Sequence, residues 1–436
     1  MKKPLLAQKL QLSSGIRRKT ASHLRHKKAL TGLRACSRFF VPNLLRPFSS
    51  RFSLSTAISG LALLLLAAVF PARPARGADT GDIPDGIVRV GILDSSKSAS
   101  IELRGKTKIV DLSSGRQQQL SERSKMSVCA SGGGLKFGDD ILGPVIRLTP
   151  LDGEDRLRIN ERSYRGSIVV KTNPDSTLTA VEELGIEEYL YGVLPSEMGP
   201  EWPLEALKAQ AVVARTYALY TLQGASEKAS FDLCADTRCQ VYGGASEDPK
   251  AVEAVRATQG EVLLWNGRLV HAFFHANCGG RTSPSIWGGD MIRPLMGVRC
   301  PYCKESGNYK WSAFFSQETL LKFLSSLGHD AGRIKSIRVV KRNSGGRAVK
   351  FKFSTDAGSQ TASVKDLRGF LGASEFKSAY ITRVTTTSKG FRFAGRGYGH
   401  GVGMCQEGAR QMAWNGRKYK QILKFYYPGA KIACQD

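Results

Sequence analysis

The stretch YLYGVLPSEMGPEWPLEALKAQAVVARTYALY, residues 189–220, predicts a tight turn that leads directly into a long helix. Proline suits the first position of a helix because its missing N–H would have no partner there, so we expect the helix to begin at Pro203. Small and apolar residues recur at helical spacing on one side of it, namely Leu204, Leu207, Ala211, Ala214 and Ala218. Because that stripe is mostly alanine, another element can approach the helix backbone closely.

Glu197 stands in the predicted turn, just ahead of the helix. A carboxylate whose direction is fixed by a turn and a helix suits a general acid. The alternative is that Glu197 caps the helix or pairs with Lys208, which is the common role of a glutamate at a helix start. Arg215 lies on the same helix and could return towards the turn, where it would lower the pKa of Glu197.

Three stretches of the chain resemble one bacterial family. EYLYGVLPSEMGPEWPLEALKAQAVVARTYAL contains the turn and helix, DLCADTRCQVYGG follows at 232–244, and GRGYGHGVGMCQEGARQMAWNGRKYKQILKFYYPGA spans 395–430. Their sequence and order resemble the stage II sporulation protein D and amidase-enhancer (LytB) family over roughly residues 87–432. The resemblance implies an exported, peptidoglycan-active protein whose best understood relatives are lytic transglycosylases.

A lytic transglycosylase can work with one carboxyl group, whereas most glycosidases need two. The C6 hydroxyl of muramic acid attacks the anomeric carbon, while Glu197 protonates the glycosidic oxygen and then accepts the hydroxyl proton. Glu197 must therefore be protonated near neutral pH, which requires partial burial among apolar neighbours such as Met198 and Trp202. The side chains expected to bind substrate are Arg215, Gln240, Tyr242, His271, His400 and Gln406.

The sequence is also compatible with two other functions. The amidase-enhancer branch suggests a non-catalytic wall-binding activator of an N-acetylmuramoyl-L-alanine amidase. A zinc-dependent wall hydrolase is the third alternative. The sequence contains no GxSxG and no HExxH, so it gives no support to a serine hydrolase or a metalloprotease of those classes. It also lacks a GxxxxGK[ST] phosphate loop, which argues against nucleotide binding.

The chain carries a net charge of +27, and much of it is concentrated at the N-terminus. Fifteen Lys and Arg and no acidic residue precede Asp79, which leaves +12 for the remainder. A positive surface suits an anionic polymer such as the cell wall, but equally nucleic acid or a membrane. The sequence contains no zinc-finger spacing that ends in paired histidines and no aromatic RNA-binding signature, so we expect no nucleic-acid partner.

An uncharged stretch at 52–72 follows the basic leader, and its most apolar part is LALLLLAAVF at 61–70. That length is typical of a signal peptide rather than a membrane span. Small residues at 75–78 permit cleavage, and the preceding positive charge favours export of everything that follows. We therefore expect a domain on the periplasmic or cell-wall side, secreted or anchored in the membrane. An organellar transit peptide is a weaker alternative for this leader.

Cysteine spacing predicts a metal site. An HxxC pair followed by CxxC is typical of tetrahedral zinc and gives the candidate ligands His275, Cys278, Cys300 and Cys303. Outside the cytoplasm the alternatives are disulfides and free buried thiols. Some relatives in the resembled family carry zinc on histidine and cysteine in the second stretch. Here Lys228 replaces the expected histidine, which argues against that site at Cys234 and Cys239.

Short alternating strands and helices interleave, and most strand connections are short enough for hairpins. We expect an α+β fold with mixed, largely antiparallel sheets, packed helices and a substrate cleft between subdomains. Residues 181–194 are expected to be helical, and WNGR at 265–268 is typical of a hairpin. The expected parts are a basic leader with a signal peptide or anchor (1–78), an N-terminal β-rich part (79–180), a catalytic core segment (181–310), an α/β insertion (311–394) and a C-terminal block that completes the core (395–436).

Overall fold

The computed structural model of this chain describes residues 86–120, 124–153, 156–199, 201–226, 229–285 and 291–434. The basic leader and the apolar stretch 52–72, on which the expected signal peptide or membrane anchor falls, lie outside these residues. Among the helices that are described, none combines the length and the apolar character needed to cross a membrane.

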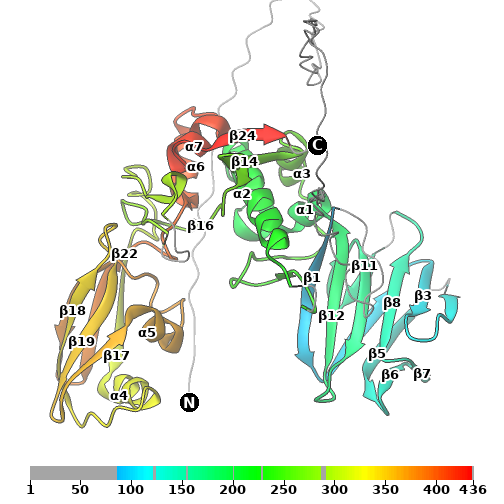
Figure 1. Ribbon diagram of the computed structural model, residues 1–436, viewed down its shortest axis with the longest axis horizontal. Coiled ribbons are helices and arrows are strands. Elements are labelled where there is room, and N and C mark those ends of the chain that lie inside the picture. Colours follow the sequence, from blue (N-terminus) through cyan, green and yellow to red (C-terminus); the bar gives the residue numbers. More distant parts are fainter. Residues whose placement is uncertain are drawn as a thin grey trace, which may run out of the picture. The chain divides into compact units, whose positions relative to one another are not determined.

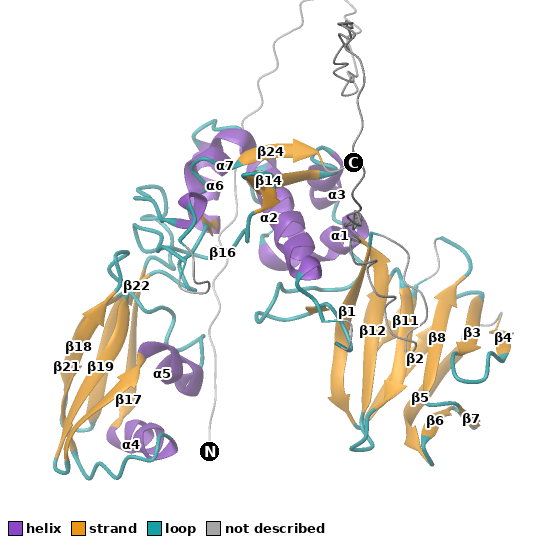
Figure 2. Cartoon of the chain, viewed as in Figure 1, coloured by secondary structure: helices purple, strands orange, loops and turns teal. Residues whose placement is uncertain are grey.

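Two antiparallel sheets form the β-rich part that begins at Ile87 (Figures 1 and 2). The first has the order β13 (Leu233–Cys234), β1 (Ile87–Ser96), β12 (Leu178–Gly185), β11 (Ser167–Thr172), β8 (Val145–Pro150), β3 (Thr107–Asp111) and β4 (Gln117–Leu120). The second has the order β10 (Arg162–Tyr164), β9 (Leu157–Ile159), β2 (Ser98–Leu103), β5 (Ser124–Ser131), β6 (Gly134–Phe137) and β7 (Asp140–Leu142). Among the described strands of these two sheets, β13 alone pairs in parallel, along the edge of β1.

The helix predicted from the alanine stripe is α2 (Leu204–Gln223), with Pro203 as its N-cap. The stripe is buried apart from the half-buried Leu204, and the helix packs against several other elements. These elements are α1 (Ile186–Glu197), α3 (Pro249–Arg256), α6 (Gln406–Trp414), α7 (Tyr419–Tyr426) and β14 (Glu261–Trp265). Alanine permits this close packing because it leaves room beside the helix backbone on several sides at once.

Two small sheets bring the C-terminal stretch to the segment that follows α3. One contains β15 (Arg268–Leu269), β14 and β24 (Lys431–Cys434), and the other pairs β16 (Phe274–His275) in parallel with β23 (Met404–Cys405). The hairpin expected at WNGR joins β14 to β15, and positive φ angles at Asn266 and Gly267 allow its tight turn.

Residues from Trp311 to Phe393 contribute a second, separate hydrophobic cluster. Its elements are β17 (Lys310–Ser316), α4 (Gln317–Ser326), β18 (Ile334–Arg342), β19 (Ala348–Thr355), β20 (Gly358–Ser363), α5 (Val364–Leu371), β21 (Ile381–Thr386) and β22 (Gly390–Arg396). The strands form the sheets β17-β22-β21 and β18-β19-β20, both antiparallel. A short 3₁₀ helix, Arg293–Leu295, precedes this part of the chain.

The α+β class with largely antiparallel sheets is confirmed. The predicted helix at 181–194 is wrong in its first part, because residues up to Gly185 belong to β12 and the helix α1 begins only at Ile186. Pairing explains the difference: β12 lies between β1 and β11, and hydrogen bonds on both edges hold it extended. The substrate cleft and the domain boundaries stay predictions.

Candidate active site

Glu197 is the last residue of α1 rather than part of a free turn. Its Oε1 accepts a hydrogen bond from the backbone N–H of Val241 at 2.7 Å, and its Oε2 accepts one from the side-chain amide of Gln406 at 3.3 Å. Burial raises the pKa of this carboxyl group, while the two hydrogen bonds lower it to a smaller extent. Glu197 forms no ion pair among the described residues, so no cation counteracts the effect of burial.

A close approach of two backbones brings Val241 to Glu197. Gly192 of α1 accepts a hydrogen bond from Gly243 N–H at 3.2 Å, and a Cβ at position 192 would collide with the carbonyl oxygen of Gly244. A disulfide between Cys234 and Cys239 closes the turn that precedes this segment. Glycine at 192 is therefore a requirement for placing the N–H donor on the carboxyl group.

Gln240 and Tyr242, which we expected to bind substrate, flank Val241 in the chain. Both side chains are buried. The Gln240 amide donates to the carbonyl of Ala214 in α2 at 3.3 Å. The hydroxyl of Tyr242 donates to Glu182 Oε2 at 2.7 Å, and Glu182 Oε1 accepts from the backbone N–H groups of Arg165 and Gly166. Through these contacts, Gln240 and Tyr242 help to fix the position of the 241–244 segment.

Arg215 does not return towards Glu197. Its guanidinium forms two hydrogen bonds with the carboxylate of Glu187, at 2.7 and 2.6 Å, and a third with the carbonyl of Glu261 at 2.9 Å. The side chain of Arg215 is only 1% exposed. Its charge is thus used to join α2 to the start of α1, and the pKa-lowering contact that would compromise an acid at Glu197 is absent from the described residues.

Gln406 is brought directly to Glu197. As the first residue of α6, it donates from its side-chain amide both to the Glu197 carboxylate and to the Glu197 backbone carbonyl, each at 3.3 Å. The two residues are separated by 209 positions in the chain. The C-terminal stretch therefore supplies part of the surroundings of the carboxyl group.

The expected histidines gather in a second cluster. His271 stacks on Tyr220 with ring centroids 4.2 Å apart, and burial lowers its pKa to about 4. His400 Nδ1 accepts from Val402 N–H at 3.1 Å, which leaves the proton on Nε2 to be donated to the carbonyl of Phe274 at 2.7 Å. Burial also lowers the pKa of His400 to about 4, so both imidazoles are neutral at pH 7.

Four buried cysteines meet in one place: Cys278, Cys300, Cys303 and Cys405. Their Sγ atoms all lie within 4.8 Å of one another, which fits a tetrahedral metal ion with four sulfur ligands. The N–H of Cys278 donates to Cys405 Sγ at 3.2 Å, and Tyr426 Oη lies 3.2 Å from Cys300 Sγ. Hydrogen bonds from polar groups to the sulfur ligands orient and stabilise a metal–thiolate centre.

The predicted ligand set is wrong in one member. His275 is not in the four-cysteine cluster, because its Nδ1 bonds to the carbonyl of Val402 at 3.0 Å and its ring faces His400, with centroids 5.4 Å apart. Cys405 takes its place. The local spacing of residues 275–303 gave no sign of this, since Cys405 follows Cys278 by 127 residues.

Comparison with known proteins agrees with the first two of the three stretches noted in the sequence. Residues 174–265 match the family described as stage II sporulation protein, and residues 296–403 match a domain of unknown function (DUF8618). Stage II sporulation protein D of Bacillus subtilis is 32% identical over 277 residues, covering 59% of this chain and 77% of that protein. The chain belongs to the stage II sporulation protein D family.

Two further relatives extend the comparison. An uncharacterized protein of Brachyspira hyodysenteriae is 34% identical over 348 residues, covering 79% of this chain and 92% of its own length. The amidase enhancer of Bacillus subtilis is 34% identical over 291 residues, covering 56% of this chain. This chain spans only 40% of the amidase enhancer's length. The family match at 174–265 includes Glu197 and Val241, whereas Gln406 lies beyond both matched ranges.

Proposed function

We propose that this protein is a peptidoglycan lytic transglycosylase in which Glu197 is the general acid and base. The observation that carries the proposal is a half-buried carboxyl group with a raised pKa, bonded by two neutral donors and by no cation among the described residues. Such a group retains a proton to higher pH than an exposed glutamate, as an acid for the glycosidic oxygen must.

Both donors have a use after the first proton transfer. Once Glu197 has protonated the leaving oxygen, its carboxylate is stabilised by the N–H of Val241 and the amide of Gln406. It can then remove the proton from the C6 hydroxyl of muramic acid as that oxygen attacks the anomeric carbon. The proton balance is closed without water, and the product ends in a 1,6-anhydro sugar.

Replacing Glu197 with glutamine tests this assignment. Glu197→Gln keeps an acceptor for the Val241 N–H in its amide oxygen. It loses only the longer side-chain bond with Gln406, which keeps its hydrogen bond to the backbone carbonyl of residue 197. We expect normal folding but a fall in glycan cleavage of at least ~10²-fold, the usual scale of general acid–base catalysis. The measurement is mass spectrometry of 1,6-anhydromuramic ends after digestion of peptidoglycan.

Glu188→Gln is the matched control, because Glu188 lies exposed on the same helix α1. It should retain cleavage. If Glu197→Gln also cleaves at the wild-type rate, Glu197 is not the acid.

The similarity to the amidase enhancer favours a second function, a non-catalytic wall-binding activator of an amidase. That function requires no proton transfer by Glu197. An activator would release no anhydro ends in either form, and the wild-type chain and Glu197→Gln would stimulate a purified N-acetylmuramoyl-L-alanine amidase equally.

We also propose that the four-cysteine cluster binds Zn²⁺, held by Cys278, Cys300, Cys303 and Cys405. Four thiolates close the coordination shell of zinc and leave no position for water, which is the pattern of a structural site. A zinc-dependent hydrolase would need an open position, so this donor set supports a role in folding rather than in hydrolysis.

Export is part of the proposed function, because peptidoglycan lies outside the cytoplasmic membrane. A reporter that is active only after translocation, fused after Asp79, should be active in cells, and a fusion that lacks residues 52–72 should not. Activity of a reporter that works only in the cytoplasm, fused at the same position, would contradict export and with it the proposed substrate.

A further inference from the structure

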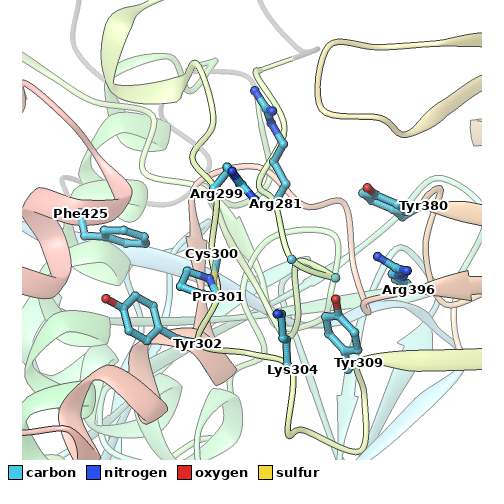
Figure 3. Close-up of a pocket in the computed structure, with 12 residues that line it drawn as sticks. Arg281, Arg299, Cys300, Pro301, Tyr302, Lys304, Tyr309, Tyr380, Arg396 and Phe425 are labelled. Atoms are coloured by element: carbon cyan, nitrogen blue, oxygen red, sulfur yellow. The ribbon is translucent and has the colours of Figure 1, made fainter.

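A cavity of about 850 Å³ lies apart from Glu197, which is not among its lining residues (Figure 3). Four cationic side chains line it: Arg281, Arg299, Lys304 and Arg396. No acidic residue does, and across the described part of the chain none of these four forms an ion pair. All four residues are exposed, so the cavity presents a concentrated positive charge to solvent.

Aromatic rings form much of the remaining wall. Figure 3 shows Tyr309, Tyr380 and Arg396 along one side of the cavity and Tyr302 and Phe425 along the other. The rings of Tyr302 and Phe425 meet edge to face at 5.5 Å, and the Arg396 guanidinium lies 5.8 Å from the centre of the Tyr309 ring. Flat apolar faces interspersed with cations suit a ligand that has both apolar ring surface and negative charge.

Backbone contacts fix the walls before any ligand arrives. Gly279 and Gly280 have positive φ angles, and a Cβ on Gly280 would lie 3.1 Å from the hydroxyl of Tyr309. Gly397 N–H donates to the carbonyl of Tyr309, and Arg396 N–H donates to that of Tyr380, both at 2.9 Å. A site that is already formed avoids much of the entropy cost of ordering side chains on binding.

The cavity is also joined to the surroundings of Glu197 by the four-cysteine cluster. Cys300 lines the cavity and shares that cluster with Cys405, whose next residue, Gln406, binds the Glu197 carboxylate. Eight of the twelve lining residues fall within the 296–403 match to the domain of unknown function. That domain therefore contributes most of a preformed cationic site adjoining the family's core.

We propose that this cavity binds a carboxylate-bearing glycan, with sugar rings on the tyrosine faces and carboxylates on the arginine and lysine side chains. This inference rests on the proposed function, because it takes the glycan of the bacterial cell wall as the ligand. Carboxylates in that polymer come from the lactyl group of muramic acid or from the peptide stems, and guanidinium groups bind either source through paired hydrogen bonds.

The test measures binding by calorimetry to the full chain carrying Glu197→Gln, so that the ligands are not cleaved. The probes are a peptidoglycan tetrasaccharide with its stems, the same tetrasaccharide stripped of stems, and a neutral N-acetylglucosamine tetramer. Lys304→Gln with Arg396→Gln removes two cavity charges. Lys350→Gln with Arg392→Gln removes two charges at exposed positions outside the cavity and is the matched control.

We expect the cavity variant to bind at least one carboxylated tetrasaccharide ~10-fold or more weakly, and the control variant to bind as the parent does. Loss for the stripped probe alone assigns the lactyl carboxylate, which the stem-bearing probe carries only as an amide. Loss for the stem-bearing probe alone assigns the stems, and loss for both shows that the cavity accepts either carboxylate. Unchanged affinity of the cavity variant, equal losses in the control, or equal binding of the neutral tetramer would overturn the proposal.

Cleavage separates this inference from the proposed function. With Glu197 intact, the cavity variant should still release anhydro ends from a carboxylated tetrasaccharide supplied at saturating concentration. If the wild-type chain releases none while cavity-dependent binding persists, the transglycosylase assignment fails and the binding site stands.

Discussion

At the scale of single residues, two glutamates of the same chain have raised pKa values in different surroundings. Glu197 lies at the end of α1 with two donors and is half-buried, whereas Glu182 is fully buried in β12 and accepts from two backbone N–H groups and Tyr242. Burial raises the pKa of Glu182 to about 7 despite these bonds. A buried carboxyl group is therefore not a sign of catalysis by itself, and contact with a ligand-accessible space must decide.

The raised pKa of Glu182 has a consequence for stability. A group that binds its proton more tightly when folded contributes stability that is fully present below its unfolded pKa, here 4.5, and that is lost as pH rises through about 7. The difference between the folded and unfolded pKa values of Glu182 corresponds to about 3 kcal/mol in the free energy of unfolding. We expect Glu182→Gln to remove this loss, because its oxygen keeps the two N–H donors and its NH₂ group can donate to the Tyr242 hydroxyl.

Urea unfolding of both proteins between pH 4.5 and 8 measures the effect. The wild-type free energy of unfolding should fall more steeply over that interval than that of Glu182→Gln. Glu253→Gln, at an exposed position of α3, should follow the wild type. Parallel pH profiles for wild type and Glu182→Gln would show that Glu182 is ionised in the folded state.

At the scale of elements, α2 is the support on which the candidate site is assembled. It packs against α1, which ends at Glu197, and against α6, which begins at Gln406. The pair between Arg215 and Glu187 fixes the start of α1, and the Gln240 amide fixes the 241–244 segment on Ala214. The relative positions of the Glu197 carboxyl group and its two hydrogen-bond donors thus depend on contacts along one helix.

Arg215→Met should lower the free energy of unfolding by about 3 kcal/mol, because it leaves the Glu187 carboxylate without its buried partner. Lys322→Met is the matched control: its pair with Glu318 is exposed, at 69% and 76%, and its loss should leave the free energy of unfolding nearly unchanged. Denaturant titration gives both values. A variant with wild-type stability but a raised KM for glycan would instead support the substrate-binding role expected from the sequence.

At the scale of the whole molecule, the four-cysteine cluster joins segments that are far apart in the sequence. Cys278 follows β16, Cys300 and Cys303 precede β17, and Cys405 ends β23 next to Gln406. A metal ion here would hold the start of the 311–394 segment, the chain that returns from it, and the core in one place. Because structural zinc and folding are coupled, its removal should loosen all three together.

Purified protein should contain about one zinc per chain, measured by elemental mass spectrometry. Cys405→Ser should lose most of this zinc and about 2 kcal/mol or more of stability, which is measured as a lower Tm. Cys129→Ser, at a half-buried position in β5 outside the cluster, should retain the metal. Metal-free protein that needs oxidised cysteines at these positions for its stability would favour disulfides instead.

The sequence by itself determined the elements whose signals are local. The alanine stripe and Pro203 located α2, WNGR located a hairpin, and the long runs of matched residues identified the family. Spacing over 25 residues also found three of the four clustered cysteines, because a CxxC and a nearby cysteine are visible in a short window.

Only the tertiary structure decided which distant groups meet. Sequence spacing could not show that β12 extends to Gly185, that Arg215 binds Glu187, that Cys405 replaces His275, or that Val241 and Gln406 bond to Glu197. Each of these depends on a pairing made across tens to hundreds of residues, and the free energy of such a contact arises from burial and complementary donors that exist only after the chain has packed.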